Sequence, residues 1–248
     1  MYKTTSLNYV TTYERDLEGG YANCTVTGER NSGTTFLAEL LRKHGLTVYD
    51  GLCLYNLQLT WKHDFARNDL KLVGPNPVNI FIVRDLDKWL ITTYHKPYYL
   101  HMERYEPLFG FIFRKQRLSK RPNIAKTVRD GKVLNHTDEN KTIFEIRYEK
   151  LQSYIKFFNE NTNVVIVKLE YLQNEENCIY FMQQLSQKYG FKFQTIHGCM
   201  DKHTKSGRPN EKNIKYSTVI CPLTRAIINL KKNEELENYV NNLTFEMK

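Results

Sequence analysis

The chain has 248 residues, of which 41% are hydrophobic and 25% charged, and its formal net charge is +9. This length fits one large domain or two small ones, and the composition excludes collagen-like, low-complexity and disordered chains. The positive charge favours an anionic partner, such as a charged nucleotide or an acidic glycan. Because lysine and arginine are spread without a long basic run, a nucleic-acid-binding tail is disfavoured.

The beginning of the chain and its cysteines indicate neither a membrane anchor nor a metal site. Residues 1–20 are a polar lead-in without the apolar core of a signal peptide, and no run of 18 apolar residues occurs. None of the five cysteines forms a CxxC pair, and their odd number favours reduced thiols. We therefore expect no membrane span, no metal and a cytoplasmic location. The cysteines are Cys24, Cys53, Cys178, Cys199 and Cys221.

Strands and helices are predicted in alternation along the first hundred residues. The expected strands are 21–28, 46–52 and 78–84, and the expected helices are 32–45 and 85–96. The segment VNIFIVR (78–84) is a continuous β-branched and aromatic run, typical of a central parallel strand. Pro97 ends the helix that follows it.

The same alternation returns in the second half, after an aromatic and basic stretch. Residues 98–141 lack periodicity and predict an irregular insertion or lid. We expect helices over 141–161 and 174–190, a strand over 162–172, a polar basic loop over 201–213, and a helix or helix pair over 223–243. Strands alternating with helices predict a single α/β domain over 1–248, a three-layer αβα arrangement with a central parallel sheet.

The segment TVTGERNSGTTFL (25–37) predicts a phosphate-binding loop. A strand ends at Gly28, a tight loop follows, and a helix begins near Gly33, so backbone N–H groups and a helix N-terminus point at one place. Thr34 stands where ATP- and GTP-binding loops need lysine, which argues against a kinase or nucleotide hydrolase.

This loop resembles that of the sulfotransferase family, whose members bind 3′-phosphoadenosine 5′-phosphosulfate. The match is Ser32-Gly33-Thr34-Thr35. The family commonly has a basic residue where this chain has Asn31, and Arg30 is the nearest base. The resemblance implies a nucleotide-binding fold of the phosphate-loop type.

A second motif is similar to the family's 3′-phosphate site. Arg84 ends a predicted strand, Thr92 follows eight residues later where serine is usual, and Tyr94 follows two beyond that. Weaker similarity extends to WKH (61–63), to VVIVKLEYL (164–172) and to the basic segment HTKSGR (203–208).

The resemblance implies transfer of a sulfuryl group from 3′-phosphoadenosine 5′-phosphosulfate to a hydroxyl or amine, without a metal. His63 is the candidate base, Lys62 its electrostatic helper, and Arg30 neutralises charge on the leaving phosphate. Glu170 is the rival carboxylate. The nucleotide contacts implied are Gly28, Arg30, Asn31, Ser32, Gly33, Thr34, Thr35, Arg84, Thr92, Lys205 and Arg208.

The acceptor and two other functions remain open. A carbohydrate or phenol suits aromatic walls, and such residues are numerous near the insertion. The rival functions are a phosphate-loop kinase and a non-catalytic module that binds nucleic acid or an acidic glycan. The candidate acceptor residues are Tyr94, Tyr98, Tyr99, Tyr105, Phe109, Phe111 and Phe113.

Overall fold

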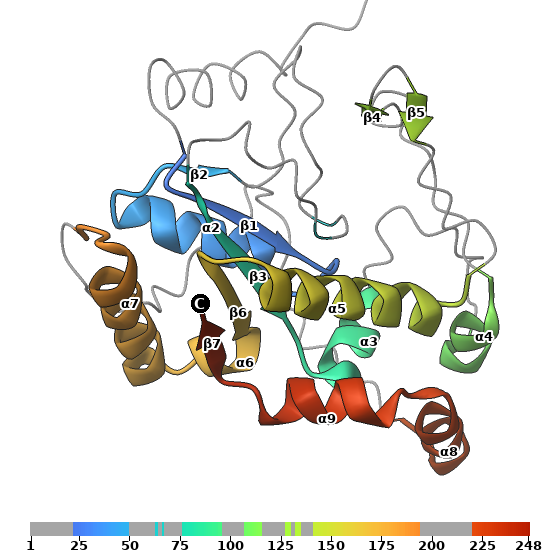
Figure 1. Cartoon of the computed structure of the whole chain (residues 1–248). Coiled ribbons are helices and arrows are strands. Elements are labelled where there is room, and N and C mark those ends of the chain that lie inside the picture. The colour runs from blue at the N-terminus through green and yellow to red at the C-terminus, as the bar shows by residue number, and fades with distance from the viewer. Residues whose placement is uncertain are drawn as a thin grey trace, which may run out of the picture.

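A five-stranded sheet lies at the centre of the chain, in the strand order β2-β1-β3-β6-β7 (Figure 1). The computed structural model describes residues 22–49, 63, 66, 76–95, 107–115, 127–129, 132–134, 141–193 and 220–248. The strands of the sheet are β1 (Cys24–Gly28), β2 (Val48–Tyr49), β3 (Val78–Val83), β6 (Val164–Lys168) and β7 (Phe245–Met247). Over the described ranges, none of the helices combines the length and apolar character that a membrane crossing needs.

Four of the five strands are parallel. In register, Thr27 of β1 pairs with Phe81 of β3, and Phe81 pairs in turn with Ile166 of β6. These three strands are adjacent and parallel, as a central parallel sheet requires. β7, for which the sequence predicts no strand, runs antiparallel to β6, so the central sheet is mostly and not entirely parallel. The three residues of β7 are too few to carry a readable pattern, and pairing with the exposed edge of β6 decides their conformation.

Helices flank the sheet on both faces, in positions close to those predicted. The predicted last segment is a pair of helices, α8 and α9, because Lys232 is extended and the Asn233 side chain caps a new helix by accepting from the Leu236 backbone N. The helices are α2 (Thr34–Lys43), α3 (Leu86–His95), α4 (Leu108–Phe113), α5 (Ile143–Glu160), α6 (Leu169–Leu172), α7 (Glu175–Tyr189), α8 (Pro222–Lys231) and α9 (Glu234–Asn242).

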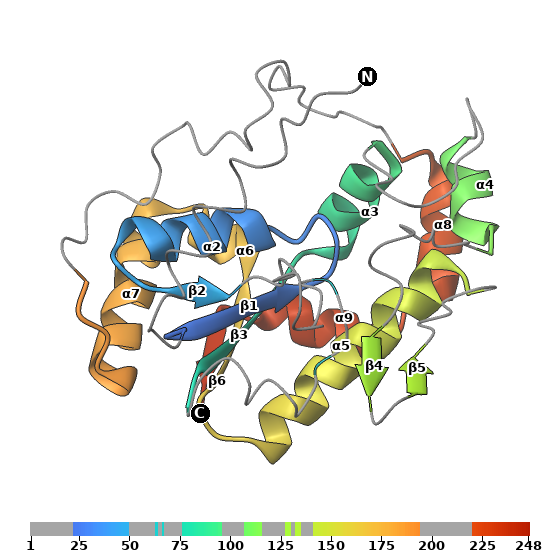
Figure 2. The ribbon, with the colours of Figure 1, turned by 90° about the horizontal axis from the view of Figure 1, so that it is seen from above.

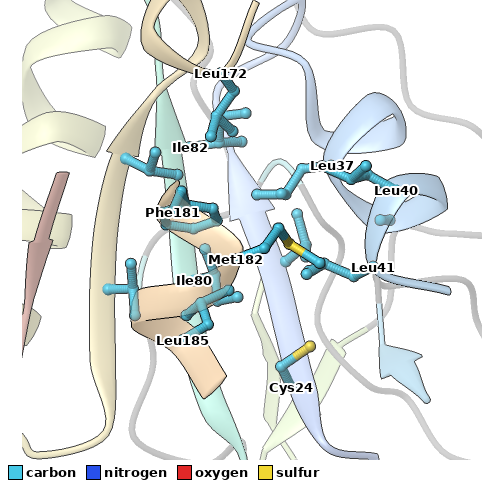
Figure 3. Close-up of a cluster of buried hydrophobic side chains, with 14 of the residues drawn as sticks. Cys24, Leu37, Leu40, Leu41, Ile80, Ile82, Leu172, Phe181, Met182 and Leu185 are labelled. Carbon is cyan, nitrogen blue, oxygen red and sulfur yellow. The ribbon is translucent and has the colours of Figure 1, made fainter. Parts of the chain in front are cut away.

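Alternating side chains of β3 divide the core into two layers. Ile80 and Ile82 pack with α2 and α7 on one face (Figure 3). Phe81 points to the other face, where it stacks on Tyr154 of α5 at 4.8 Å between ring centroids. The view in Figure 2 separates the same two sets of helices across the sheet. The chain is therefore a mixed α/β fold built in three layers.

Part of the expected insertion joins the core. Phe111 of α4 is fully buried in a third apolar cluster with Leu90 of α3 and Ile228 of α8. A two-stranded hairpin, β4 (Thr127–Arg129) with β5 (Lys132–Leu134), also falls within 98–141. The lid remains a prediction, since most of that range lies outside the described residues.

The cysteines differ from one another in state. Cys24 and Cys221 are free thiols, whereas Cys178 is disulfide-bonded, so the expectation of reduced thiols is wrong at Cys178. Spacing along the chain could not reveal this, because disulfides form where folding brings two Cβ atoms together. Burial raises the pKa of Cys24 to about 12, which keeps that thiol protonated within the core.

Candidate anion-binding site at the carboxyl edge of the sheet

The carboxyl ends of β1, β3 and β6 meet at one edge and bring the predicted site residues together. Gly28 ends β1, Arg84 follows β3, and Glu170 lies two residues after β6. Open α/β sheets bind ligands at this edge, because loops and helix N-termini converge there. Figure 2 shows the turn from β1 into α2 lying beside the start of α3.

The loop between Gly28 and Gly33 is held by its own hydrogen bonds. Ser32 donates to the Glu29 carbonyl twice, from its backbone N at 3.2 Å and from its hydroxyl at 2.6 Å. Asn31 and Gly33 have φ values of 61° and 95°, in the left-handed region. Ser32 is fully buried, so both its hydroxyl and its backbone N–H serve the loop, and the expectation that Ser32 contacts the nucleotide directly finds no support in this geometry.

The N-terminus of α2 opens onto this loop. Its N-cap is Gly33, which has no side chain to cap the helix, and the first intrahelical bond runs from Leu37 N to Gly33 O at 3.0 Å. The N–H groups of residues 34–36 consequently have no acceptor within the helix. Thr35 is exposed and Thr34 is buried. Such an end attracts anions through its N–H groups and its dipole.

Both glycines of the loop fit where a larger residue would not. A Cβ on Gly28 would meet the Ile82 carbonyl oxygen and would come within 2.6 Å of the Ser32 hydroxyl. A Cβ on Gly33 would lie 2.7 Å from Leu169 Cδ1 of α6. The loop is thus packed directly on the end of β3 and the start of α6.

Arg84 faces the loop with part of its guanidinium still available. Its Nη1 donates to the Asn31 carbonyl at 3.0 Å and to the Thr92 hydroxyl at 2.9 Å, while its Nε lies 3.3 Å from Glu170 Oε1. Arginine has five N–H donors. Among the described residues, no acceptor contacts the two donors on Nη2, which leaves them for a ligand.

The helix α3 is tied to the loop by two further contacts. Trp89 Nε1 donates to the Arg30 carbonyl at 2.8 Å, and the Asn31 amide donates to the Thr93 hydroxyl at 3.2 Å. Thr92 donates its own hydrogen to the Lys88 carbonyl at 2.7 Å and so accepts from Arg84. The two segments predicted to bind the two phosphates therefore form one unit.

His63 lies against the same loop, in a turn. Its Nδ1 is 3.0 Å from the Gly28 carbonyl oxygen. A carbonyl oxygen only accepts, so Nδ1 carries the proton and Nε2 is the basic nitrogen of the neutral ring. This tautomer suits a general base.

Glu170 is engaged in positioning neighbouring groups. Its Oε1 receives Arg84 Nε, and its Oε2 accepts from the backbone N of Asp85 at 3.2 Å. Burial alone raises the pKa of Asp85, but hydrogen bonds from Lys168 and Lys88 hold that pKa below its ordinary value. These contacts favour a structural role for Glu170 over that of a base.

Several predicted residues are either not described by the structure or not part of this site. Lys62, Lys205 and Arg208 fall outside the described residues, as do Tyr98, Tyr99 and Tyr105. Phe111 is a core residue that meets the half-buried Tyr94 edge to face at 5.6 Å, whereas Phe109 and Phe113 are exposed on α4. Phe111 therefore cannot line an acceptor cleft.

A charged network that the sequence alone did not reveal lies behind the loop. Glu29, Arg147 of α5 and Glu237 of α9 are buried together, with Glu29 Oε2 2.6 Å from Arg147 Nη1 and Glu237 Oε1 2.7 Å from Arg147 Nε. The available signal was Arg147 itself, which occupies the apolar face of a helix between Phe144 and Leu151.

Comparison with known proteins finds no counterpart: no protein-family model, no curated protein and no solved structure matches this chain.

Proposed function

We propose that the chain is a sulfotransferase that moves a sulfuryl group from 3′-phosphoadenosine 5′-phosphosulfate to a hydroxyl or amine of an acceptor. The observation that carries the proposal is the joining of two anion-binding features at one sheet edge. Arg84, with its Nη2 donors available, is hydrogen-bonded to the loop that opens the N-terminus of α2. A nucleotide with separate 5′- and 3′-phosphates needs two such features side by side.

The residues fit this nucleotide in a definite way. The backbone N–H groups from Gly33 to Thr35, with the Thr35 hydroxyl, would hold the 5′-phosphosulfate, and Arg30 would offset its charge. Arg84 and Thr92 would hold the 3′-phosphate. When bound, the nucleotide supplies the sulfuryl group and a phosphate as leaving group.

His63 supplies the proton acceptor. Its Nδ1–H bond to the Gly28 carbonyl holds the ring beside the loop and keeps Nε2 basic. A nucleophile's proton moves to Nε2 as the nucleophile attacks sulfur. His63 therefore acts from beside the end of β1, next to the group that is transferred.

The two rival functions account for less of this geometry. A phosphate-loop kinase needs a lysine that reaches the phosphate tail, but position 34 holds a threonine whose side chain is buried. A non-catalytic module that binds nucleic acid or an acidic glycan does not need a basic nitrogen at His63 Nε2. The net charge of +9 is the feature in favour of that module.

Nucleotide binding and turnover test the proposal directly. Calorimetry with adenosine 3′,5′-bisphosphate, ATP and a short RNA should give tightest binding to the bisphosphate. Incubation with the labelled sulfate donor and a panel of sugars, phenols and amines should then label one acceptor class. Equal binding of ATP, or preference for RNA, would favour a rival function.

A further inference from the structure

Arg147 lies directly behind the candidate site and makes hydrogen bonds in three directions. Its side chain projects from α5 and is fully buried. Nη1 donates to Glu29 Oε2 at 2.6 Å, while Nε and Nη2 hold the two oxygens of Glu237 at 2.7 and 2.9 Å. Nη2 also donates to the backbone carbonyl of Arg84 at 2.8 Å. One guanidinium thus links the loop, α9 and the end of β3.

A contact between Arg147 and the Trp89 ring connects the guanidinium to a second residue of the loop, Arg30. The Arg147 Cζ atom lies 4.7 Å from the centroid of the Trp89 ring, within the range of a cation–π interaction. The same indole donates to the Arg30 carbonyl at 2.8 Å. Two consecutive loop residues, Glu29 and Arg30, are therefore held by Arg147, one directly and one through Trp89.

The burial of Arg147 decides what kind of role it can have. A side chain with no exposed surface cannot touch a nucleotide, so Arg147 acts only through its partners. Replacing a buried ionic network with apolar residues is often neutral for stability. What this network adds is a fixed direction for the Glu29 side chain and for the Arg84 carbonyl.

We propose that Arg147 is a positioning residue that makes the phosphate loop at 28–33 and the Arg84 site form as one unit. Without it, Glu29 and the Arg84 backbone lose a common anchor, and both anion sites loosen together. The nature of the ligand rests on the proposed function, whereas the coupling between the two segments does not.

Hydrogen exchange in the nucleotide-free protein tests the coupling itself. Two backbone amides report on the two segments: Ser32 N, bonded to the Glu29 carbonyl, and Asp85 N, bonded to Glu170 Oε2. In Arg147→Lys, both amides should exchange at least about tenfold faster, as loss of charge-assisted bonds predicts. The amide of Gly190, at the end of α7, should be unchanged.

Arg225 provides the matched control. It also forms an ion pair, at 2.7 Å with Asp87, but at a side chain that is 42% exposed. Arg225→Lys should leave the exchange of Ser32 and Asp85 at the wild-type rate. Unchanged exchange of both amides in Arg147→Lys, or acceleration of only one, would overturn the proposal.

Nucleotide binding then separates the coupling from the proposed function. Arg147→Lys should weaken the binding of adenosine 5′-monophosphate and of adenosine 3′-monophosphate by a similar factor, about ten or more. Weakening of only one would overturn the coupling. If the wild-type protein binds neither, the proposed function fails, and the exchange rates still decide the role of Arg147.

A second variant covers failure of Arg147→Lys to fold. Glu237→Gln keeps one oxygen acceptor for Arg147 but removes the charge, at a position remote from the loop in sequence. The exchange rates of the Ser32 and Asp85 amides should rise by the same factor as each other, and by less than in Arg147→Lys. A change confined to the amides of α9 would show that Glu237 and Arg147 stabilise only that helix and would overturn the proposal.

Discussion

Arg84 donates from Nη1 to the backbone carbonyl of Asn31 at 3.0 Å, and this contact joins two segments 53 residues apart. Asn31 presents that carbonyl because its backbone is left-handed, with φ at 61°. Asparagine adopts this conformation more readily than most residues. The position at which the sulfotransferase family commonly has a basic residue thus serves here as a joint between the two proposed phosphate sites.

Replacement of Arg84 should affect one phosphate more than the other. Arg84→Ala should weaken adenosine 3′,5′-bisphosphate by about tenfold or more, since a charge-assisted hydrogen bond contributes about 1.5–3 kcal/mol. The affinity for adenosine 5′-monophosphate should fall much less, because this nucleotide lacks the 3′-phosphate. Calorimetry with both nucleotides measures the difference, and equal losses would mean that Arg84 does not contact the 3′-phosphate.

His63 should be required for turnover but not for nucleotide binding. His63→Ala should lower turnover by about 10²–10⁴-fold, the usual contribution of a general base, with an unchanged affinity for adenosine 3′,5′-bisphosphate. His95→Ala is the control, since His95 is exposed at the end of α3. Turnover that survives in His63→Ala would redirect the search for the base to Glu170.

Glu170→Gln distinguishes a positioning carboxylate from a base. The amide keeps an oxygen for Asp85 N or Arg84 Nε but cannot accept a proton. We expect turnover to fall by less than about tenfold, well short of the loss of a general base. A loss as large as that of His63→Ala, measured in the same acceptor assay, would identify Glu170 as the base.

Gly33 and Gly190 form a matched pair for testing the loop. Both have positive φ, at 95° and 70°, but a Cβ on Gly33 would lie 2.7 Å from Leu169 Cδ1, whereas nothing lies within 4 Å of one on Gly190. Gly190→Ala should lower the free energy of unfolding only by the strain of placing a Cβ at positive φ, about 1–2 kcal/mol. Gly33→Ala should lower the free energy of unfolding by more, because the new Cβ also overlaps Leu169.

The two alanine variants also differ in their expected effect on binding. Gly33→Ala should weaken binding of adenosine 5′-monophosphate, because the shifted loop moves the N–H groups at the start of α2. Gly190→Ala should leave binding unchanged. Urea denaturation and calorimetry on both variants supply the comparison, and equal stabilities would contradict the packing of Gly33 on α6.

Glu29 should make stability depend on pH. Burial raises its pKa from an ordinary 4.5 to about 7, with Glu237 adding to the rise, while Arg147 and Lys150 oppose it. The folded protein therefore binds this proton more tightly than the unfolded chain. The resulting stability is fully present below about pH 4.5 and is lost as the pH rises to about 7.

Glu29→Gln should flatten that profile. Thermal unfolding of the wild type between about pH 5 and pH 8 should show the fall, and the variant should show a smaller one, since glutamine does not titrate. Glu145→Gln is a suitable control, because Glu145 is an exposed carboxyl of the α5 capping box with a lowered pKa. Identical dependence of stability on pH in Glu29→Gln and the wild type would mean that a group other than Glu29 causes it.

Local sequence determined the elements and the edge at which the site forms. Periodicity located α2, α3, α5 and α7, and the runs of β-branched residues located β3 and β6, because these patterns report burial directly. The spacing from Gly28 to Thr35 likewise indicated a strand, a loop and an uncapped helix. The meeting of Arg84 with this loop followed from the rule that parallel strands end at one edge.

Only the tertiary structure decided which partners those residues have. The antiparallel pairing of β7, the Ser32 hydroxyl turned into its own loop, and Glu170 bound to Arg84 all depend on contacts between distant segments. The burial of Arg147 between Glu29 and Glu237, 118 and 90 residues away, is the clearest case. A charged side chain is stable in a core only when folding surrounds it with acceptors, and neither composition nor periodicity records where those acceptors lie.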